Sequence, residues 1–89
     1  MISQEVAIVN RLGLHARAAA KLVECAGRFA SRIEIRKGES SADAKSIMSV
    51  MMLAAGKGMT LELTADGQDE VEAVEAIVAL FADRFGEPD

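Results

Sequence analysis

The spacing of apolar residues switches repeatedly between a period of two and a period of about 3.6 along the chain. Alternation of apolar and polar residues predicts strands, and apolar residues at i, i+3, i+4 and i+7 predict amphipathic helices. The segments with strand spacing are 2–9, 32–36 and 60–64, and those with helix spacing are 16–26 and 69–85. Because 89 residues suffice for one hydrophobic core and not for two, the pattern predicts a single α+β domain over residues 1–89.

Two further elements complete the expected order. The polar segment 39–43 follows a Lys37-Gly38 turn and predicts only a weak edge strand. Ser46 is of the residue type that caps helices and precedes the apolar stretch 47–53, so a short helix is expected to begin there. The order β-α-β-β-α-β-α predicts a four-stranded antiparallel sheet with three helices packed on one face.

The last predicted helix is the longest element and begins at Asp69 or Glu70. Its apolar stripe consists of Val74, Ile77, Val78, Phe81 and Phe85. Gly86 and Pro88, residue types that commonly follow a helix, are expected to stop it after Phe85. The acidic residues of its first turns complement the helix dipole, and we interpret them as a solvated helix start rather than as a catalytic cluster.

The chain contains one cysteine, one histidine, three phenylalanines, no tryptophan and no tyrosine. A single cysteine cannot form an internal disulfide, and with one histidine it cannot complete a structural zinc site. We therefore expect no metal, no cofactor, and a core of aliphatic residues and alanine. Cys25 falls at the border of an apolar stripe and is expected to be partly buried.

Charge is distributed unevenly along the chain, whose net charge is −4. Residues 1–65 hold nine Lys/Arg and six Asp/Glu, a balance of +3, whereas residues 66–89 hold one and eight, a balance of −7. The whole chain would repel nucleic acid, so we expect its basic part to meet an acidic protein surface instead. The longest nearly apolar run, 47–55, is far shorter than the roughly 18 residues of a membrane span. With no targeting segment evident, we expect a cytoplasmic protein without membrane contact.

The only histidine, His15, stands where the loop 12–14 gives way to the first predicted helix. If His15 is the N-cap, the amides of Arg17 and Ala18 have no acceptor within the helix, and the helix dipole adds positive charge beside the ring. Arg17 can add a guanidinium group whose shape suits phosphate oxygens. These positive surroundings are expected to leave one ring nitrogen unprotonated and nucleophilic near neutral pH.

Such a nitrogen is suited to accept a phosphoryl group and to pass it on, because no base or metal directs water onto the phosphate. The alternative is a solvated histidine at a helix start, in a small binding module without phosphotransfer. A Cys–His pair is excluded, because Cys25 follows His15 by ten residues, about 15 Å along a helix. Gly56-Lys57-Gly58 lacks other residues of a phosphate-binding loop, so we interpret it as a turn after a helix.

Ser46 has two compatible interpretations. Its hydroxyl is expected to cap the short helix, and a phosphate on it would be tolerated by the helix dipole and would act on binding. Ile47, Met48 and Met51 are too apolar for so small a core to bury completely. We expect these three residues to form an exposed partner surface.

Two motifs stand at a fixed separation: Gly13-Leu14-His15-Ala16-Arg17 and, with its serine thirty-one positions after the histidine, Lys45-Ser46-Ile47-Met48. With the length and the order of elements, they make the chain similar to HPr, the histidine-containing phosphocarrier family of the bacterial phosphoenolpyruvate-dependent phosphotransferase system. The resemblance implies an open-faced β-sandwich. It also implies that Nδ1 of His15 takes a phosphoryl group from enzyme I and gives it to a histidine of an EIIA protein. Arg17 and the helix N-terminal amides at Ala16 and Ala18 would hold the phosphate.

The resemblance extends to regulation and docking. It implies that an ATP-dependent kinase, an HPr kinase/phosphorylase, phosphorylates Ser46, and that the added charge slows transfer through His15. The docking face for enzyme I would consist of Ala20, Lys21, Ile47, Met48 and Met51. We expect a monomer that carries phosphoryl groups rather than an independent enzyme. The same carrier step fits sugar transport and a regulatory relay without sugar uptake.

The chain departs from the family pattern at three positions. Ala18 stands where many members have proline, which restores a backbone N–H at the phosphate site. Leu12 occupies a position that is often polar in relatives, and Ala54 replaces a common glycine. The changes at Leu12 and Ala54 bear on hydroxyl contacts to the phosphate and on the end of the second helix, and neither touches His15.

Overall fold

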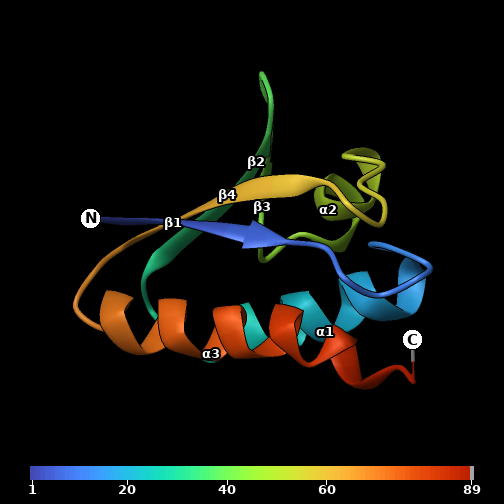
Figure 1. The fold of residues 1–89 in the computed structure, drawn as a ribbon. Coiled ribbons are helices and arrows are strands. Elements are labelled where there is room, and N and C mark those ends of the chain that lie inside the picture. The colour runs from blue at the N-terminus through green and yellow to red at the C-terminus, as the bar shows by residue number, and fades with distance from the viewer. Residues whose placement is uncertain (89) are drawn as a thin grey trace.

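Four strands form one antiparallel sheet in the order β1-β4-β2-β3 in the computed structural model, which describes residues 1–88. The elements along the chain are β1 (Ile2–Ala7), α1 (Ala16–Ala26), β2 (Arg32–Lys37), β3 (Ser40–Asp43), α2 (Ile47–Met52), β4 (Thr60–Asp66), α3 (Glu70–Ala82) and the short 3₁₀ helix η1 (Arg84–Gly86) (Figure 1). Apart from η1, this is the order of elements that the apolar spacing predicts.

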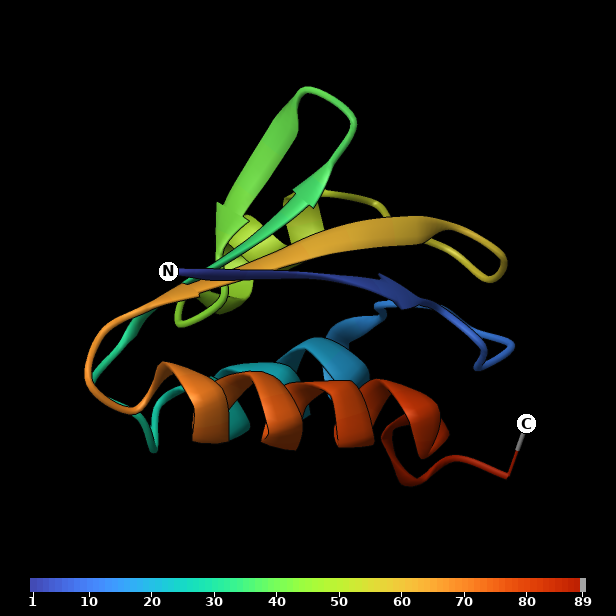
Figure 2. The same ribbon diagram turned by 60° about the vertical axis from the view of Figure 1, so that its left-hand side comes forward.

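The helices gather on one side of the sheet. α1 and α3 lie side by side along it, and α2 packs against α1 and β3. Within residues 1–88, the opposite face of the sheet is covered by no helix, as Figure 2 shows. This arrangement confirms the predicted α+β fold and the open-faced sandwich.

The alternation of the strands places their apolar side chains toward the helices. Leu61 of β4 lies opposite Val6 of β1, and Leu63 of β4 lies opposite Ile35 of β2. All four are buried, and burial of such a side chain contributes about 1.5–3 kcal/mol. Because alanine is small, the helices can approach this layer closely. Their completely buried alanines are Ala18, Ala19, Ala26 and Ala73.

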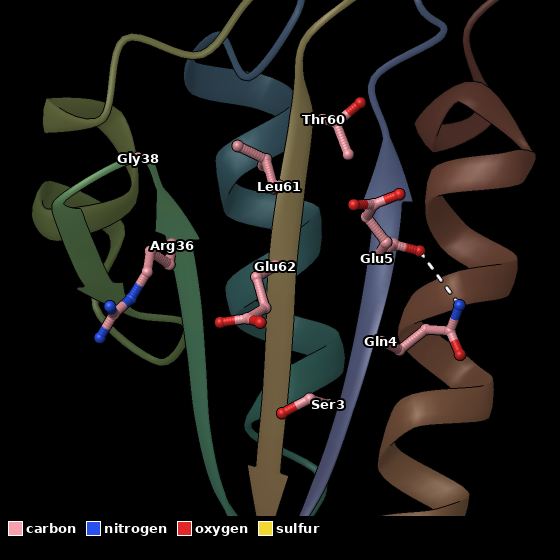
Figure 3. A pocket seen from close by; sticks show the side chains of 8 residues that line it. All are labelled: Ser3, Gln4, Glu5, Arg36, Gly38, Thr60, Leu61 and Glu62. Atoms are coloured by element: carbon pink, nitrogen blue, oxygen red, sulfur yellow. Dashed lines mark hydrogen bonds between the residues drawn. The ribbon is translucent and has the colours of Figure 1, made fainter.

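The uncovered face of the sheet is polar. Glu62 of β4 lies opposite Glu5 of β1 on one side and opposite Arg36 of β2 on the other. Figure 3 shows these side chains with Ser3 and Thr60 around a shallow depression. Because its side chains are charged or small and polar, this face of the sheet is compatible with exposure to solvent. His15 is not among the residues that line the depression.

β1 ends at Ala7, two residues before the predicted end at position 9. Ile8 nevertheless continues the alternation, since its side chain is buried, its N–H donates to the carbonyl of Met59 at 2.9 Å and its carbonyl accepts from the N–H of Gly58 at 2.9 Å. The alternation therefore predicts the burial of Ile8 correctly. It does not predict that the regular pairing with β4 ends at Ala7, one residue before Ile8.

α3 ends at Ala82, three residues before the predicted end at Phe85. Arg84 and Phe85 have φ values of +57° and +55°, so the chain turns left-handed after the helix. The turn brings Phe85 back into the core, where its ring centroid lies 4.9 Å from that of Phe81 in an edge arrangement. The apolar stripe predicts the burial of Phe85. It cannot show that a turn after the helix, and not the helix itself, places Phe85 in the core.

Asp69 joins the start of α3 to the loop before β2. Its carboxylate accepts hydrogen bonds from the N–H of Ala30 at 2.8 Å, the N–H of Ser31 at 2.9 Å and the hydroxyl of Ser31 at 2.5 Å. The Ser31 hydroxyl and these amides hold the pKa of Asp69 below its usual range. Asp69 therefore lies at the helix start, as the sequence predicts, and its carboxylate is in addition a structural link to the loop before β2.

Asp69→Asn is expected to lower Tm at neutral pH, because an amide cannot accept the three hydrogen bonds as well as a carboxylate does. The pKa of Asp69 is lower in the folded than in the unfolded chain, so its stabilisation is present above the unfolded value of about 4. That stabilisation is lost as the pH falls through the folded-state pKa. The Tm difference between variant and wild type should therefore shrink in acid. Asp83→Asn, at the exposed far end of α3, is the control, and a Tm deficit of Asp69→Asn that stays constant with pH would contradict the account.

The turn after α2 contains a strained residue. Ala54 has a φ of +51°, in the left-handed region that costs an L-residue about 1–2 kcal/mol. This conformation gives a physical reason why glycine is common here in the family that the chain resembles. The replacement of glycine by Ala54 therefore places strain at the end of α2.

Ala54→Gly is expected to raise the free energy of unfolding by about 0.5 kcal/mol, since relief of the strain exceeds the added entropy of glycine in the unfolded chain. Ala79→Gly, on the exposed side of the right-handed helix α3, is the matched control and should lower it by about 1 kcal/mol. Urea denaturation of both variants measures the difference. Equal losses at the two positions would show that Ala54 is not strained.

Candidate active site

His15 lies at the start of α1, where the preceding loop is held against the segment after α2. Gly13 has a φ of +67°, and a Cβ there would lie 2.6 Å from the carbonyl oxygen of Ala55, so only glycine fits. Leu14 is buried, and its N–H donates to the same carbonyl at 2.9 Å. His15 then takes an extended conformation with φ −72° and ψ 177°, and α1 begins at Ala16. The predicted N-cap position of His15 is confirmed.

The hydrogen bonds of the imidazole assign its tautomer. Nδ1 of His15 accepts from the N–H of Arg17 at 3.3 Å. Because a backbone N–H can only donate, Nδ1 carries a lone pair and the proton of the neutral ring is on Nε2. Nε2 is hydrogen-bonded to a carboxylate oxygen of Glu87. The side chain is 28% exposed, so a lone pair lies at the helix start within reach of solvent.

Glu87 belongs to the segment after η1 and carries no signal in the sequence pattern. One of its carboxylate oxygens contacts His15, and the other accepts from Nδ2 of Asn10 at 3.0 Å. Asn10 is completely buried and also donates to the carbonyl of Gly13 at 2.8 Å. The hydrogen bond from His15, together with that from Asn10, holds the pKa of Glu87 below its usual range. Sequence reasoning missed both Glu87 and Asn10.

The ring is surrounded by charges of both signs. The helix start and Arg17 are positive, as the sequence predicts, but Glu87 adds a negative charge on the Nε2 side. The sequence therefore predicts the positive part of these surroundings and misses the negative charge of Glu87. An open cavity of about 550 Å³ gives access to the site and is lined by Arg11, Leu12, His15, Ala16, Arg17, Glu87 and Pro88.

The first turn of α1 directs backbone amides toward the same end of the helix. The bond from the N–H of Ala19 to the carbonyl of His15, at 2.8 Å, is the first of the helical ladder. The amides of Ala16, Arg17 and Ala18 precede it and have no acceptor four residues back within the helix. Such a turn is suited to hold an anion. A proline in place of Ala18 would remove one of these amides.

Exposed apolar side chains gather on α2, which packs against α1. The exposed fractions are 39% for Ile47, 67% for Met48, 41% for Met51 and 80% for Met52. The exposure predicted for the first three is confirmed, and Met52 extends the surface beyond the prediction. We call these four residues the α2 surface.

The remaining predicted residues lie on α1 and at the start of α2. Ser46 is the N-cap of α2, and its hydroxyl accepts from the N–H of Ser49 at 3.4 Å. Ala20 is exposed. The ammonium group of Lys21 donates to the carbonyl of Phe85 at 2.5 Å, so Lys21 supports the turn after α3 in addition to lying on the exposed side of α1.

Cys25 is buried more completely than expected, with 6% of its surface exposed, and this burial raises the pKa of its thiol. Among residues 1–88, no group of three or more His, Cys, Asp or Glu side chains is placed to hold a metal ion. Over the same range, no helix has the length and apolar character needed to cross a membrane.

Comparison with known proteins identifies the family. The model of the PTS HPr component phosphorylation site matches residues 2–83. The chain belongs to the HPr family. The phosphocarrier protein HPr of Cupriavidus necator is 54% identical over 87 residues, which cover 98% of both chains. A crystal structure of HPr from Thermoanaerobacter tengcongensis superposes with a TM-score of 0.96 at 42% identity and covers both chains completely.

A third relative concerns assembly. The catabolite repression HPr of Bacillus subtilis, Crh, is similar at a TM-score of 0.76 and 39% identity over 94% of this chain and 97% of that one, and its crystal structure is described as a swapped, intertwined dimer. Family membership makes this chain an HPr-type phosphocarrier of the phosphotransferase system.

Proposed function

We propose that this chain carries phosphoryl groups between protein histidines, taking them from phospho-enzyme I on Nδ1 of His15 and delivering them to a histidine of an EIIA protein. The observation that supports this most directly is the lone pair of Nδ1, held 3.3 Å from the Arg17 amide at the start of α1. In the transfer, the Arg17 N–H releases Nδ1 and turns to a phosphoryl oxygen, and the freed lone pair forms a new N–P bond. The N–P bond to the enzyme I histidine breaks at the same time and returns its electron pair to that imidazole.

The phosphoryl group would be held by backbone and side chain together. The amides of Ala16, Arg17 and Ala18 would donate to its oxygens, and the Arg17 guanidinium, exposed beside the site, would supply the compensating charge. Ala18 contributes an N–H that a proline would lack. No group in this set is placed as a base for water, which is consistent with a group that is held and then passed on.

Docking would use the α2 surface together with Ala20 and Lys21 of α1. Exposed methionines adapt to apolar partners, and the packing of α2 against α1 places this surface next to the helix that His15 begins. The basic balance of residues 1–65 favours an acidic partner face. We propose that enzyme I and EIIA proteins bind here.

The complete acceptor site lies within one chain, so we propose that the protein acts as a monomer in the cytoplasm, where phosphoenolpyruvate and enzyme I would be found. The carrier step is the same for sugar uptake and for a regulatory relay. The proposal therefore concerns the transfer itself and not the pathway that it serves. An HPr kinase/phosphorylase would slow this transfer by phosphorylating Ser46.

Incubation with enzyme I and phosphoenolpyruvate is expected to produce an acid-labile phosphate on this chain, seen by mass spectrometry and lost on brief acid treatment. His15→Ala should abolish it, because no other side chain presents an imidazole lone pair. Glu39→Ala, in the turn between β2 and β3, is the control and should leave labelling unchanged. Acid-labile labelling of the His15→Ala variant would refute the assignment.

Ser46→Asp is expected to leave the fold intact and to slow phosphorylation by enzyme I about tenfold or more, because a charge beside the α2 surface must be desolvated on docking. Ser46→Asn is the matched control, since asparagine caps a helix without adding charge. Circular dichroism and initial rates measure the two effects. Equal rates for the two variants would reject a regulatory role for charge at this position.

A further inference from the structure

His15 and Glu87 form a carboxylate–imidazole pair that the helix start does not explain. One Glu87 oxygen bonds Nε2 of His15 and the other accepts from Asn10 at 3.0 Å, so both oxygens are engaged. The Glu87 side chain is only 13% exposed. A surface glutamate without a structural or functional role usually has its carboxylate exposed to solvent.

The backbone around Glu87 is held as firmly as its side chain. Phe85 anchors the segment in the core with 0% exposure, and its carbonyl accepts from Lys21 at 2.5 Å. Gly86 has a φ of +76°, and the N–H of Glu87 donates to the carbonyl of Arg84 at 3.0 Å. The left-handed turn that ends α3 thus delivers the Glu87 carboxylate to the ring.

Asn10 fixes the position of that carboxylate at a cost. It is completely buried, Nδ2 donates to Glu87 and to the carbonyl of Gly13, and Oδ1 has no hydrogen-bond partner among residues 1–88. A buried oxygen without a partner is unfavourable, so an asparagine here needs a compensating role. Linking the loop before His15 to Glu87 supplies one.

Both ends of the imidazole favour the same tautomer. The Arg17 N–H at Nδ1 requires a lone pair there, and the Glu87 carboxylate at Nε2 requires a proton there. The opposite tautomer would set N–H against N–H at one end and lone pair against carboxylate at the other. Glu87 also covers Nε2, which removes it as a competing acceptor.

We propose that Glu87, held by Asn10, is a positioning residue that keeps His15 in the Nε2–H tautomer and directs the phosphoryl group to Nδ1. The effect on phosphorylation rests on the proposed function, whereas the effect on the tautomer does not. Glu87 contacts the ring nitrogen opposite the acceptor, so its removal should lower kcat for phosphorylation by enzyme I more than it changes KM.

The first measurement is the ¹⁵N spectrum of His15 in the unphosphorylated full chain. The wild type should show the Nε2–H tautomer, Glu87→Ala should show a mixture of tautomers, and Glu87→Gln should largely restore the wild-type spectrum because its amide oxygen still accepts. Glu75→Ala, an exposed carboxylate on α3, is the control. A Glu87→Ala spectrum identical to that of the wild type would overturn the proposal, whether or not the protein takes up phosphate.

The second measurement uses enzyme I and phosphoenolpyruvate. Glu87→Ala should lose about tenfold in kcat with little change in KM, and part of its product should carry phosphate on Nε2, distinguished from Nδ1 by ³¹P–¹⁵N coupling. If Glu87→Ala has the kcat of the wild type and carries phosphate only on Nδ1, Glu87 does not direct the phosphoryl group. If the wild type takes up no phosphate, the proposed function fails, and the ¹⁵N spectra alone decide the role of Glu87.

Discussion

Gly13 lies so close to the segment after α2 that a side chain there would collide with the backbone of Ala55. This contact makes the start of α1 depend on the end of α2. The Leu14 N–H donates to the Ala55 carbonyl, and the left-handed turn at Ala54 brings that carbonyl into place. Because the N-cap geometry of His15 follows directly from the position of Leu14, a backbone contact between distant segments sets the direction of the imidazole. The strain at Ala54 is thus located at the joint on which the site depends.

A second long-range constraint acts on the other side of the ring. Phe85 fills the core beside Phe81, and Lys21 holds the Phe85 carbonyl, so the segment after α3 cannot drift away from α1. Glu87 reaches His15 from this segment. The imidazole of His15, the proposed acceptor, is therefore held between two loops, one fixed through Gly13 and the other through Phe85, and its side chain remains partly exposed. Under the proposed function this group would meet two different proteins in turn and would benefit from such preorganisation.

Sequence patterns predicted the features that depend on near neighbours. The alternation of β4, the N-cap positions of His15 and Ser46 and the exposure of the α2 methionines were all predicted, because each follows from residues within one or two turns. The contact between His15 and Glu87 joins residues 72 positions apart in the sequence, so no local pattern predicts it. The left-handed turn at Phe85 was missed for a related reason: the apolar stripe continues to that position, and only packing against Phe81 shows that the helix has already ended. The hydrogen bonds of Asp69 were missed because its partners lie in the loop before β2, far away in the sequence.

The mixture of charges around His15 suits a carrier better than purely positive surroundings would. A site that bound the phosphoryl group as tightly as possible would stabilise the loaded state and slow the onward transfer, because only interactions stronger in the transition state accelerate it. The helix amides and Arg17 would face the oxygens of the phosphoryl group, whereas Glu87 bonds the opposite nitrogen and would repel the same dianion over a longer distance. Its carboxylate would at the same time stabilise the positive charge that the ring acquires when Nδ1 bonds to phosphorus. Attraction on one side and repulsion on the other keep the loaded and empty states closer in free energy, which is the condition for transfer in both directions.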